Sequence, residues 1–286
     1  MHCLVVIPLR LGSQRLAKKI LKDLIPGRSL AVQSIERVYQ SLNEFDNITY
    51  VTAIDDELTR KHLEENLSAE VKNDLHIVMT EKNCPSGTDR VYAAYDFLKN
   101  KIEAVKNCDD LAIINVQGDM PFVGSRGLQE VVKFYQSQDA SYFQKAQVVT
   151  MGQKFPDPEH FERPQSVKVL CDINKKALYF SRFPIPFSRR SREELEVVSP
   201  MTLWHIGVYG YTRKALIEFC SENPCEYERA EGLEQLRGLY LGFPYHVLET
   251  RALKGDSFRG IDTEEDFEWA RKRYLEIYGD PKNENN

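Results

Sequence analysis

VVIPLRLGSQRLAKK, at residues 5–19, joins a short apolar run to a basic loop. The run from Cys3 to Ile7 is continuous and rich in β-branched residues, which is typical of a strand buried on both faces in a parallel sheet. Pro8 has no N–H to donate to a ladder, so we expect the strand to end there. A strand of this kind predicts an α/β fold whose sheet is covered by helices on both faces.

The loop that follows Pro8 is strongly basic. It holds two Arg, two Lys, one Gly and one Ser between residues 10 and 19, and no acidic residue occurs before Asp23. Open α/β sheets bind polyanions in loops of this composition at the carboxyl ends of their strands. The spacing matches neither the Walker nor the dinucleotide-binding pattern. These residues alone therefore leave both a triphosphate site and a solvated loop open.

Composition narrows the functional class. The chain has 286 residues, of which 42% are hydrophobic, and a net charge of -5. That charge argues against bulk nucleic-acid binding, which needs a basic face. Apolar runs are shorter than ten residues and no signal-peptide pattern is visible, so we expect a cytoplasmic protein without a membrane span. The six cysteines form no C-x-x-C pair, which predicts isolated thiols.

Apolar runs and helical periods alternate along the chain up to residue 116. The pattern predicts helices at 29–44 and 57–66 and a third that ends at residue 98, with strands at 48–54, 75–80 and 111–116. Asp56 is the expected cap of the second helix. This alternation implies right-handed crossovers and a mostly parallel sheet.

Polar motifs follow several of these strands. Ser86 and Gly87 precede a helix, where free N–H groups favour phosphate or a base edge, although this motif alone favours a plain N-cap. Asp119 follows strand 111–116 in the motif Gln-Gly-Asp-Met-Pro, which suits a hard cation such as Mg²⁺ or a structural turn. Thr263 and Asp266 match a capping box, so helix initiation alone can explain Asp262, without a functional role.

From about residue 147 the sequence pattern predicts strands that pair in an antiparallel way. Strands are expected at 148–150, 166–170, 177–182 and 205–211, with polar residues at period two, including Lys168 and Ser181. Helices at 216–220 and 230–241, a strand at 245–249 and a last helix ending at 278 complete the chain. We therefore expect a single α/β domain, 1–286, with 147–212 as a smaller antiparallel subregion.

In their order along the chain, these motifs resemble the CMP-Kdo synthetases, the 3-deoxy-D-manno-octulosonate cytidylyltransferases. The matching segments span residues 7 to 266: 7–16 with Lys19, 86–90, 115–119, 167–169, 177–182, 205–209, 233–237 and 261–266. The resemblance implies a sheet of the nucleotide-diphospho-sugar transferase type with a smaller sugar-binding and dimerisation region, and a homodimer.

The resemblance also implies an activity: Mg²⁺-dependent transfer of CMP from CTP to the anomeric hydroxyl of the acidic keto-sugar Kdo, for lipopolysaccharide synthesis. Catalytic roles would fall to Lys19, Asp119 and Asp262, of which the two aspartates would hold Mg²⁺. The nucleotide would be bound by Arg10, Ser13, Lys19, Ser86, Gly87, Arg90 and Gln117. The sugar would be bound by Tyr179, Arg182, His205, Tyr209, Glu234 and Gln235.

The sequence departs from the family pattern at five positions. Leu9 stands where the family usually has Ala, Ala17-Lys18 where it has Pro-Gly, Met120 where it has Glu, and Trp204 where it has Arg. These changes leave three alternatives open: a modified acid sugar such as the 8-amino analogue or a sialic acid, a CTP-binding homologue without turnover, and a metal-dependent glycosyltransferase. Retention of Asp119, Asp262 and the cationic loop favours the cytidylyltransferase.

Overall fold

The computed structural model describes residues 1–12, 16–106, 108–145, 147–187 and 202–279. The chain divides into two units. The first unit is Met1–Leu4, Lys99–Asn115 and Gln129–Arg251, and the second unit is Val5–Leu98, Val116–Leu128 and Ala252–Asn286. Strands β1 (His2–Pro8) and β6 (Leu111–Val116) each run from one unit into the other. The assignment of 147–212 as a subregion of one domain stays a prediction.

The second unit carries the strand order β1-β4-β5, in which β4 and β5 pair in parallel. In β4 and β5, Tyr50 lies opposite Leu75 and Ile54 opposite Met79. The remaining elements of this unit are 3₁₀ helix η1 (Lys19–Leu21), β2 (Asp23–Ile25), β3 (Arg28–Ser29), α1 (Leu30–Leu42), β4 (Ile48–Ile54), α2 (Glu57–Asn66), α3 (Ala69–Asp74), β5 (Leu75–Met79), α4 (Gly87–Leu98) and α12 (Glu264–Tyr278). Helix α6 (Ser125–Gln136) begins in this unit and ends in the first. The structure thus confirms the predicted alternation of strands and helices.

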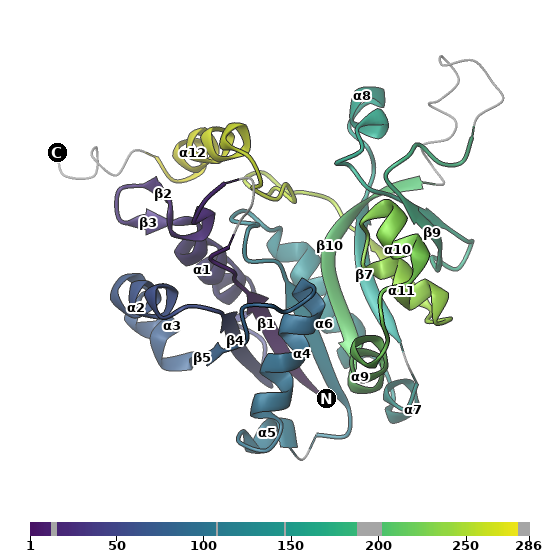
Figure 1. Ribbon diagram of the computed structural model, residues 1–286, viewed down its shortest axis with the longest axis horizontal. Coiled ribbons are helices and arrows are strands. Elements are labelled where there is room, and N and C mark those ends of the chain that lie inside the picture. The colour runs from purple at the N-terminus through teal and green to yellow at the C-terminus, as the bar shows by residue number, and fades with distance from the viewer. Residues whose placement is uncertain (13–15, 107, 146, 188–201, 280–286) are drawn as a thin grey trace. The chain divides into compact units, whose positions relative to one another are not determined.

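A hydrophobic cluster anchors the C-terminal helix of the second unit. Phe267, Ala270 and Tyr274 of α12 pack with Leu24 of β2 and with Phe122, which follows β6. Figure 1 shows α12 beside the β2–β3 hairpin, and the Arg271 side chain donates to the Asp23 carbonyl at 3.1 Å. This packing fixes the start of α12, and with it the turn that holds Asp262.

The first unit carries mostly antiparallel strand pairs. Its order is β11-β7-β10-β6, and β8 pairs with both β10 and β9. β10 is antiparallel to β7 and β8, whereas β11 is parallel to β7. The elements are α5 (Glu103–Lys106), α7 (Ala140–Phe143), β7 (Val148–Gln153), α8 (Pro158–Glu162), β8 (Lys168–Cys171), β9 (Ala177–Ser181), β10 (Thr202–Thr212), α9 (Arg213–Ser221), α10 (Glu226–Glu231), α11 (Gln235–Tyr240) and β11 (Tyr245–Glu249).

One helix prediction was wrong. The helical pattern at 230–241 covers two helices, because α10 ends at Glu231 and α11 begins only at Gln235. Gly232 has φ 61°, a left-handed conformation that caps α10 and that glycine adopts without steric cost. The break leaves the carbonyls at the end of α10 available to other groups.

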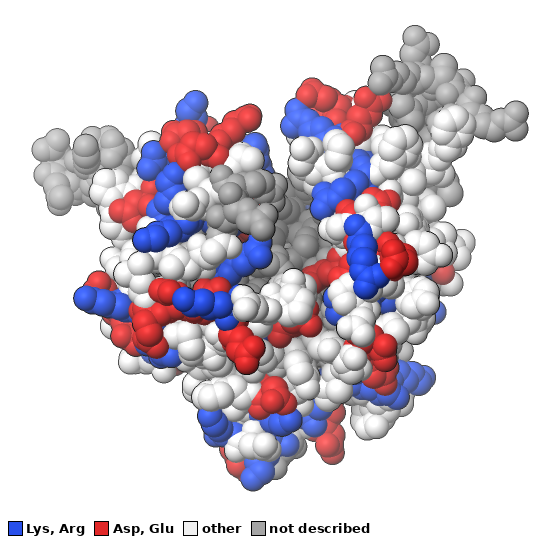
Figure 2. Space-filling view, in the orientation of Figure 1, with Lys and Arg blue, Asp and Glu red and all other residues white. Residues whose placement is uncertain are grey.

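Charges of both signs share the surface. On the face drawn in Figure 2, blue and red side chains are interspersed. Several charged side chains of the described residues pair with an opposite charge, such as Lys22 with Glu264 at 2.7 Å and Lys175 with Glu249 at 2.9 Å. Among the described residues, no helix is long and apolar enough to cross a membrane.

Candidate active site

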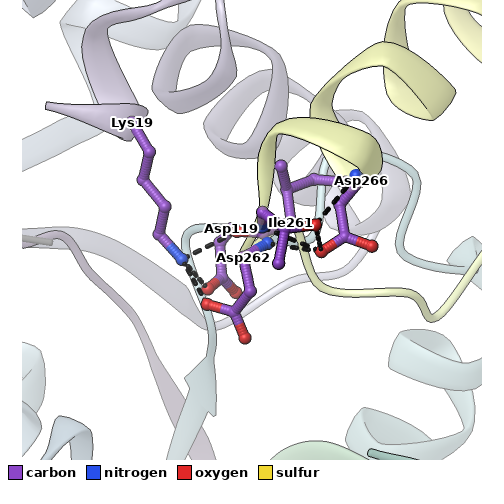
Figure 3. A network of polar contacts seen from close by, with 6 residues as sticks. Lys19, Asp119, Ile261, Asp262 and Asp266 are labelled. Atoms are coloured by element: carbon purple, nitrogen blue, oxygen red, sulfur yellow. Dashed lines mark hydrogen bonds and ion pairs between the residues drawn. The ribbon is translucent and has the colours of Figure 1, made fainter. Parts of the chain in front are cut away.

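Three charged side chains from distant parts of the sequence meet in the second unit. The ammonium of Lys19 lies 2.7 Å from Asp119 Oδ2, 3.0 Å from Asp262 Oδ1 and 2.7 Å from the Ile261 carbonyl oxygen. Figure 3 shows Lys19 reaching toward both aspartates. Lys19 is only 7% exposed. A buried cation thus sits between two carboxylates, which matches the grouping expected for the catalytic residues.

The charges of the aspartates stabilise the lysine cation. Burial by itself disfavours the ammonium, but the charges and hydrogen bonds of Asp119 and Asp262 outweigh it and raise the pKa of Lys19. Lys19 therefore stays protonated at neutral pH.

The segments that carry Asp119 and Asp262 are bonded directly to each other. The Ile261 N–H donates to the Asp119 carbonyl at 3.0 Å. Asp262 precedes α12, whose cap is Thr263 in a full capping box with Asp266. Asp266 also accepts from the Asp262 N–H at 3.1 Å. The capping box is confirmed, and because Thr263 caps the helix, the carboxylate of Asp262 can face Lys19.

Asp266 is held in its ionised form. It accepts two hydrogen bonds from the Arg259 side chain, and the Thr263 hydroxyl donates to it at 2.9 Å. Burial opposes ionisation, yet the bonds from Thr263 and Arg259 keep the pKa of Asp266 below its usual value. The sequence pattern marks Asp266 only as a capping residue, although its spacing from Asp262 places it in the same turn.

Lys18 sets the geometry of the loop before Lys19. Its backbone has φ 50° and ψ 32°, the left-handed conformation, at the position where the family pattern has Gly. The Leu21 N–H donates to the Lys18 carbonyl at 2.9 Å, which closes the 3₁₀ turn that carries Lys19. The loop thus keeps a turn suited to glycine although a lysine occupies it, at a cost of about 1–2 kcal/mol.

A cavity of about 290 Å³ opens beside the charged cluster. Besides Lys19, Asp119 and Asp262, it is lined by five further predicted nucleotide-binding residues: Arg10, Ser86, Gly87, Arg90 and Gln117. A Cβ atom on Gly87 would lie 3.1 Å from Gln117 Nε2, so the absence of a side chain there lets the Gln117 amide approach the start of α4. Ser13, also predicted to bind nucleotide, lies outside the described residues.

Two of the cavity residues also have structural partners. Ser86 Oγ accepts from the Asp89 N–H at 3.2 Å, which is the N-cap arrangement considered in the sequence analysis. Arg90 donates to Thr80 Oγ1 at 2.6 Å and to Asp55 Oδ2 at 3.2 Å. No sequence motif singles out Asp55, although it follows strand β4 just as Asp119 follows β6.

Two departures from the family pattern have a visible packing role. Leu9 is buried and covers Gly118: a Cβ atom there would lie 2.2 Å from Leu9 Cδ2. Met120 is 4% exposed. Leu9 therefore packs against the turn that presents Asp119, and Met120 is a buried residue of that turn.

The donor set of the cluster fits a hard divalent cation. Two carboxylate oxygens and one carbonyl oxygen already surround the Lys19 ammonium, which stands in for such a cation. Among the described residues no group of three or more His, Cys, Asp or Glu side chains could hold a metal alone. Mg²⁺ characteristically binds one or two carboxylates and completes its shell with water and substrate phosphates. The residues present therefore fit Mg²⁺ bound together with a nucleotide.

The predicted sugar-binding residues all lie in the first unit. Arg182 is held by several hydrogen bonds. Its guanidinium donates to the carbonyls of Glu231 at 2.7 Å, Pro164 at 3.2 Å and Gly232 at 3.3 Å. The Glu231 carboxylate accepts from the Arg182 N–H at 2.9 Å and from Ser181 Oγ at 2.6 Å. The end of α10 thus orients Arg182, while Tyr179 of β9 and Glu234 before α11 are partly exposed.

The other three predicted sugar residues are buried. His205, Tyr209 and Gln235 are 7%, 4% and 3% exposed. His205 Nε2 lies 3.0 Å from Thr150 Oγ1, and burial lowers the pKa of His205 to about 3. Because His205 is neutral at physiological pH, Arg182 is the better cation for an acidic ligand.

Trp204, another departure from the family pattern, packs in the first unit. Its ring stacks on Phe155 with centroids 6.2 Å apart and planes at 15°. His160 lies next to it at 5.8 Å. Trp204 thus replaces the usual charge with an aromatic stack.

Comparison with known proteins adds a consistent set of similarities. The family model for cytidylyltransferases matches residues 4–247. The chain is 35% identical over 274 residues to the 3-deoxy-manno-octulosonate cytidylyltransferase of Gemmatimonas aurantiaca, covering 93% of this chain and 92% of that one. It is 34% identical to the enzyme of that name from Bdellovibrio bacteriovorus, covering 91% and 93%.

Two solved structures are also similar to this chain. A CMP:2-keto-3-deoxy-manno-octonic acid synthetase complexed with CTP has a TM-score of 0.75 and 27% identity, covering 96% of this chain and 99% of that chain. A cytidylyltransferase from Leptospira borgpetersenii, at 17% identity and a TM-score of 0.57, covering 97% and 88%, shares the fold.

Proposed function

Because this chain belongs to the cytidylyltransferase family, we propose that it transfers CMP from CTP to the anomeric hydroxyl of Kdo, giving CMP-Kdo and pyrophosphate for lipopolysaccharide synthesis. Relatives named for this activity match more than nine-tenths of the chain, and a similar solved structure contains CTP. The observation that carries the proposal is the cluster of Lys19 with Asp119 and Asp262 in a cavity lined by two arginines.

The reaction needs no redox partner. The anomeric oxygen of the sugar forms a bond to the α-phosphorus of CTP, the bond from that phosphorus to the bridging oxygen breaks, and pyrophosphate leaves with the electron pair. The hydroxyl proton goes to solvent. The protein must therefore bind a triphosphate, orient an acidic sugar and offset the negative charge that builds on the phosphoryl oxygens.

Asp119 and Asp262 are the proposed ligands of Mg²⁺, with the Ile261 carbonyl beside them. When bound there, Mg²⁺ supplies charge neutralisation at the phosphates and lowers the pKa of the attacking hydroxyl. Lys19 is the proposed partner of the triphosphate, since a flexible ammonium can pass from the carboxylates to the phosphates. No protein base is required.

The remaining nucleotide contacts are proposed for residues of the same cavity. Arg10 is exposed at the cavity and suits the outer phosphates, together with Ser13. Gly87 and the Gln117 amide suit the edge of the cytosine ring, because an amide offers both a donor and an acceptor. Ser86 and Arg90 would support this side of the cavity.

Arg182 is the proposed partner of the sugar carboxylate. A guanidinium has five N–H groups, and the three carbonyl contacts of Arg182 use three of them. The other two can bind a carboxylate in the bidentate geometry that arginine favours. Tyr179, His205, Tyr209, Glu234 and Gln235 are the other proposed sugar residues.

We also propose that the enzyme is a cytoplasmic homodimer. Three large apolar side chains around β9 are strongly exposed: Ile173 at 96%, Leu178 at 57% and Phe183 at 71%. A second copy of the chain would cover such side chains. Light scattering coupled to size exclusion tests this, and a monomer at micromolar concentration would count against it.

Pyrophosphate release from CTP, Mg²⁺ and Kdo tests the function directly. The 8-amino analogue of Kdo and a sialic acid should be assayed beside it, because Met120 and Trp204 depart from the family pattern. Turnover that is fastest with Kdo is expected. Turnover only with another acid would correct the substrate, and CTP binding without pyrophosphate release from any acid would overturn the proposed reaction.

A further inference from the structure

Asp55 connects two sides of the nucleotide cavity with one carboxylate. It follows β4 at the carboxyl edge of the sheet, and its side chain is only 7% exposed. Its Oδ1 accepts from the backbone N–H of Leu11 at 3.0 Å, and its Oδ2 accepts from Arg90 Nη2 at 3.2 Å. The two oxygens therefore hold the basic loop and the first turn of α4 separately.

The loop contact fixes the backbone on both sides of Arg10. The Leu9 N–H donates to the Ala53 carbonyl at 2.8 Å, and the Leu11 N–H donates to Asp55. Arg10 lies between these two anchors and lines the cavity. Its side chain is exposed, so its direction depends on the backbone that Asp55 helps to hold.

The second contact fixes Arg90. Its side chain is 4% exposed, and its guanidinium donates to Thr80 Oγ1 at 2.6 Å and pairs with Asp55. Thr80 is itself bonded to the end of β4, because its Oγ1 donates to the Ile54 carbonyl at 2.8 Å. Arg90 belongs to α4, whose start presents Ser86 and Gly87 to the cavity. Asp55 therefore ties the start of α4 to the end of β4.

We propose that Asp55 is a positioning residue for CTP, which couples the phosphate-binding segment at Arg10 to the α4 segment at Arg90. The inference rests on the proposed nucleotide site. Asp55 is absent from the residues that line the described part of the cavity, so it acts through these two neighbours and not on the ligand. A buried ion pair of this kind fixes geometry, since each partner is costly to leave alone.

The test is CTP binding by calorimetry and steady-state kinetics with Asp55→Asn. Loss of the charge weakens the hold on Arg90 and one amide oxygen cannot serve both contacts, so Kd and KM for CTP should rise by about 10- to 100-fold. KM for the sugar should change much less. Asp56→Asn is the matched control, because the neighbouring Asp56 caps α2 by accepting from the Leu58 N–H at 2.8 Å.

A second variant separates positioning from folding. Asp55→Asn leaves the Arg90 cation without its carboxylate, which can lower the melting temperature. Asp55→Asn combined with Arg90→Met removes that buried charge, so it should regain melting temperature while CTP binding stays weak. CTP affinity is compared for Asp55→Asn, for Arg90→Met and for the double variant. A loss of affinity in the double variant equal to the product of the two single losses would overturn the coupling, because residues that act together give a smaller combined loss.

The outcomes also separate this inference from the proposed function. Failure of the wild-type protein to bind CTP would overturn the proposed nucleotide site itself. A wild-type protein that binds CTP, alongside a folded Asp55→Asn variant with unchanged Kd for CTP, would overturn the role of Asp55 alone.

Discussion

Lys19 Nζ lies 2.7 Å from Asp119 Oδ2, across 100 residues of sequence. The same ammonium binds Asp262. One lysine therefore neutralises part of the negative charge of the two neighbouring carboxylates. Such a tethered cation keeps the aspartates close together without a metal ion. It also has to move if Mg²⁺ takes its place.

Asp119→Asn and Asp262→Asn are expected to abolish turnover while the fold persists. Each removes one carboxylate charge from the proposed metal site, and loss of an electrostatic stabiliser of a phosphoryl transition state costs about 100-fold or more in kcat. Pyrophosphate release measures the effect, and circular dichroism checks the fold. Activity within a few-fold of wild type in either variant would remove that aspartate from the metal site.

Lys19→Met is expected to change two affinities in opposite directions. Without the ammonium, Asp119 and Asp262 repel each other and attract a divalent cation more strongly, so Mn²⁺ should bind the nucleotide-free protein about tenfold more tightly or better. CTP should bind more weakly, because a phosphate partner is lost. Electron paramagnetic resonance of free Mn²⁺ gives the first affinity and calorimetry the second. Unchanged Mn²⁺ affinity would contradict the expectation that Lys19 and a divalent cation compete for Asp119 and Asp262.

Lys18→Gly is expected to stabilise the protein. Lys18 has φ 50°, a conformation that costs a non-glycine residue about 1–2 kcal/mol, while glycine loses about 0.5–1 kcal/mol of backbone entropy. The net gain in the free energy of unfolding should be about 0.5–1 kcal/mol, measured by urea titration. Lys18→Ala is the control, since it removes the same charge but keeps the Cβ atom and should bring no gain.

Much of the fold could be predicted because the decisive strands are continuous apolar runs. The bounds of β4, β6 and β11 agree with the predicted segments, and so do those of α2 with its Asp56 cap. Periodicity failed at Gly232, where one helical pattern hides a left-handed break.

The site could be predicted only in part. Spacing along the chain does not reveal that Lys19 meets Asp262, which is 243 residues away. The family resemblance brought the two aspartates together, and the position of Asp119 after a buried strand gave a physical reason. Asp55 shares that position after β4, but its importance depends on two hydrogen bonds that no pattern of residue types encodes.

Gly118→Ala is expected to destabilise the turn that presents Asp119. The new Cβ atom would lie 2.2 Å from Leu9 Cδ2 and 2.9 Å from the Pro8 carbonyl oxygen. Overpacking of this kind costs about 1–3 kcal/mol and should also raise KM for CTP. Adding Leu9→Ala removes the closer contact and should restore part of the stability. Gly207→Ala is the control, because a Cβ atom there meets nothing within 4 Å.

His205 is expected to make the protein sensitive to acid. Burial lowers the pKa of His205 to about 3, whereas the unfolded chain has the ordinary value of 6.5. Above pH 6.5 both states are neutral at this residue and the stability is fully present. As the pH falls from 6.5 toward 3, only the unfolded state takes up the proton, so stability is lost at about 1.4 kcal/mol per pH unit.

The measurement is the free energy of unfolding at pH 7 and pH 5 for wild type and His205→Gln. The glutamine can still bond to Thr150 Oγ1 but does not titrate, so its loss between the two pH values should be smaller than that of wild type by about 2 kcal/mol. Equal losses would mean that His205 takes up its proton in the folded state. In that case the imidazolium would be a second cation near the sugar, and the sugar KM of wild type would fall with the pH while that of His205→Gln would not.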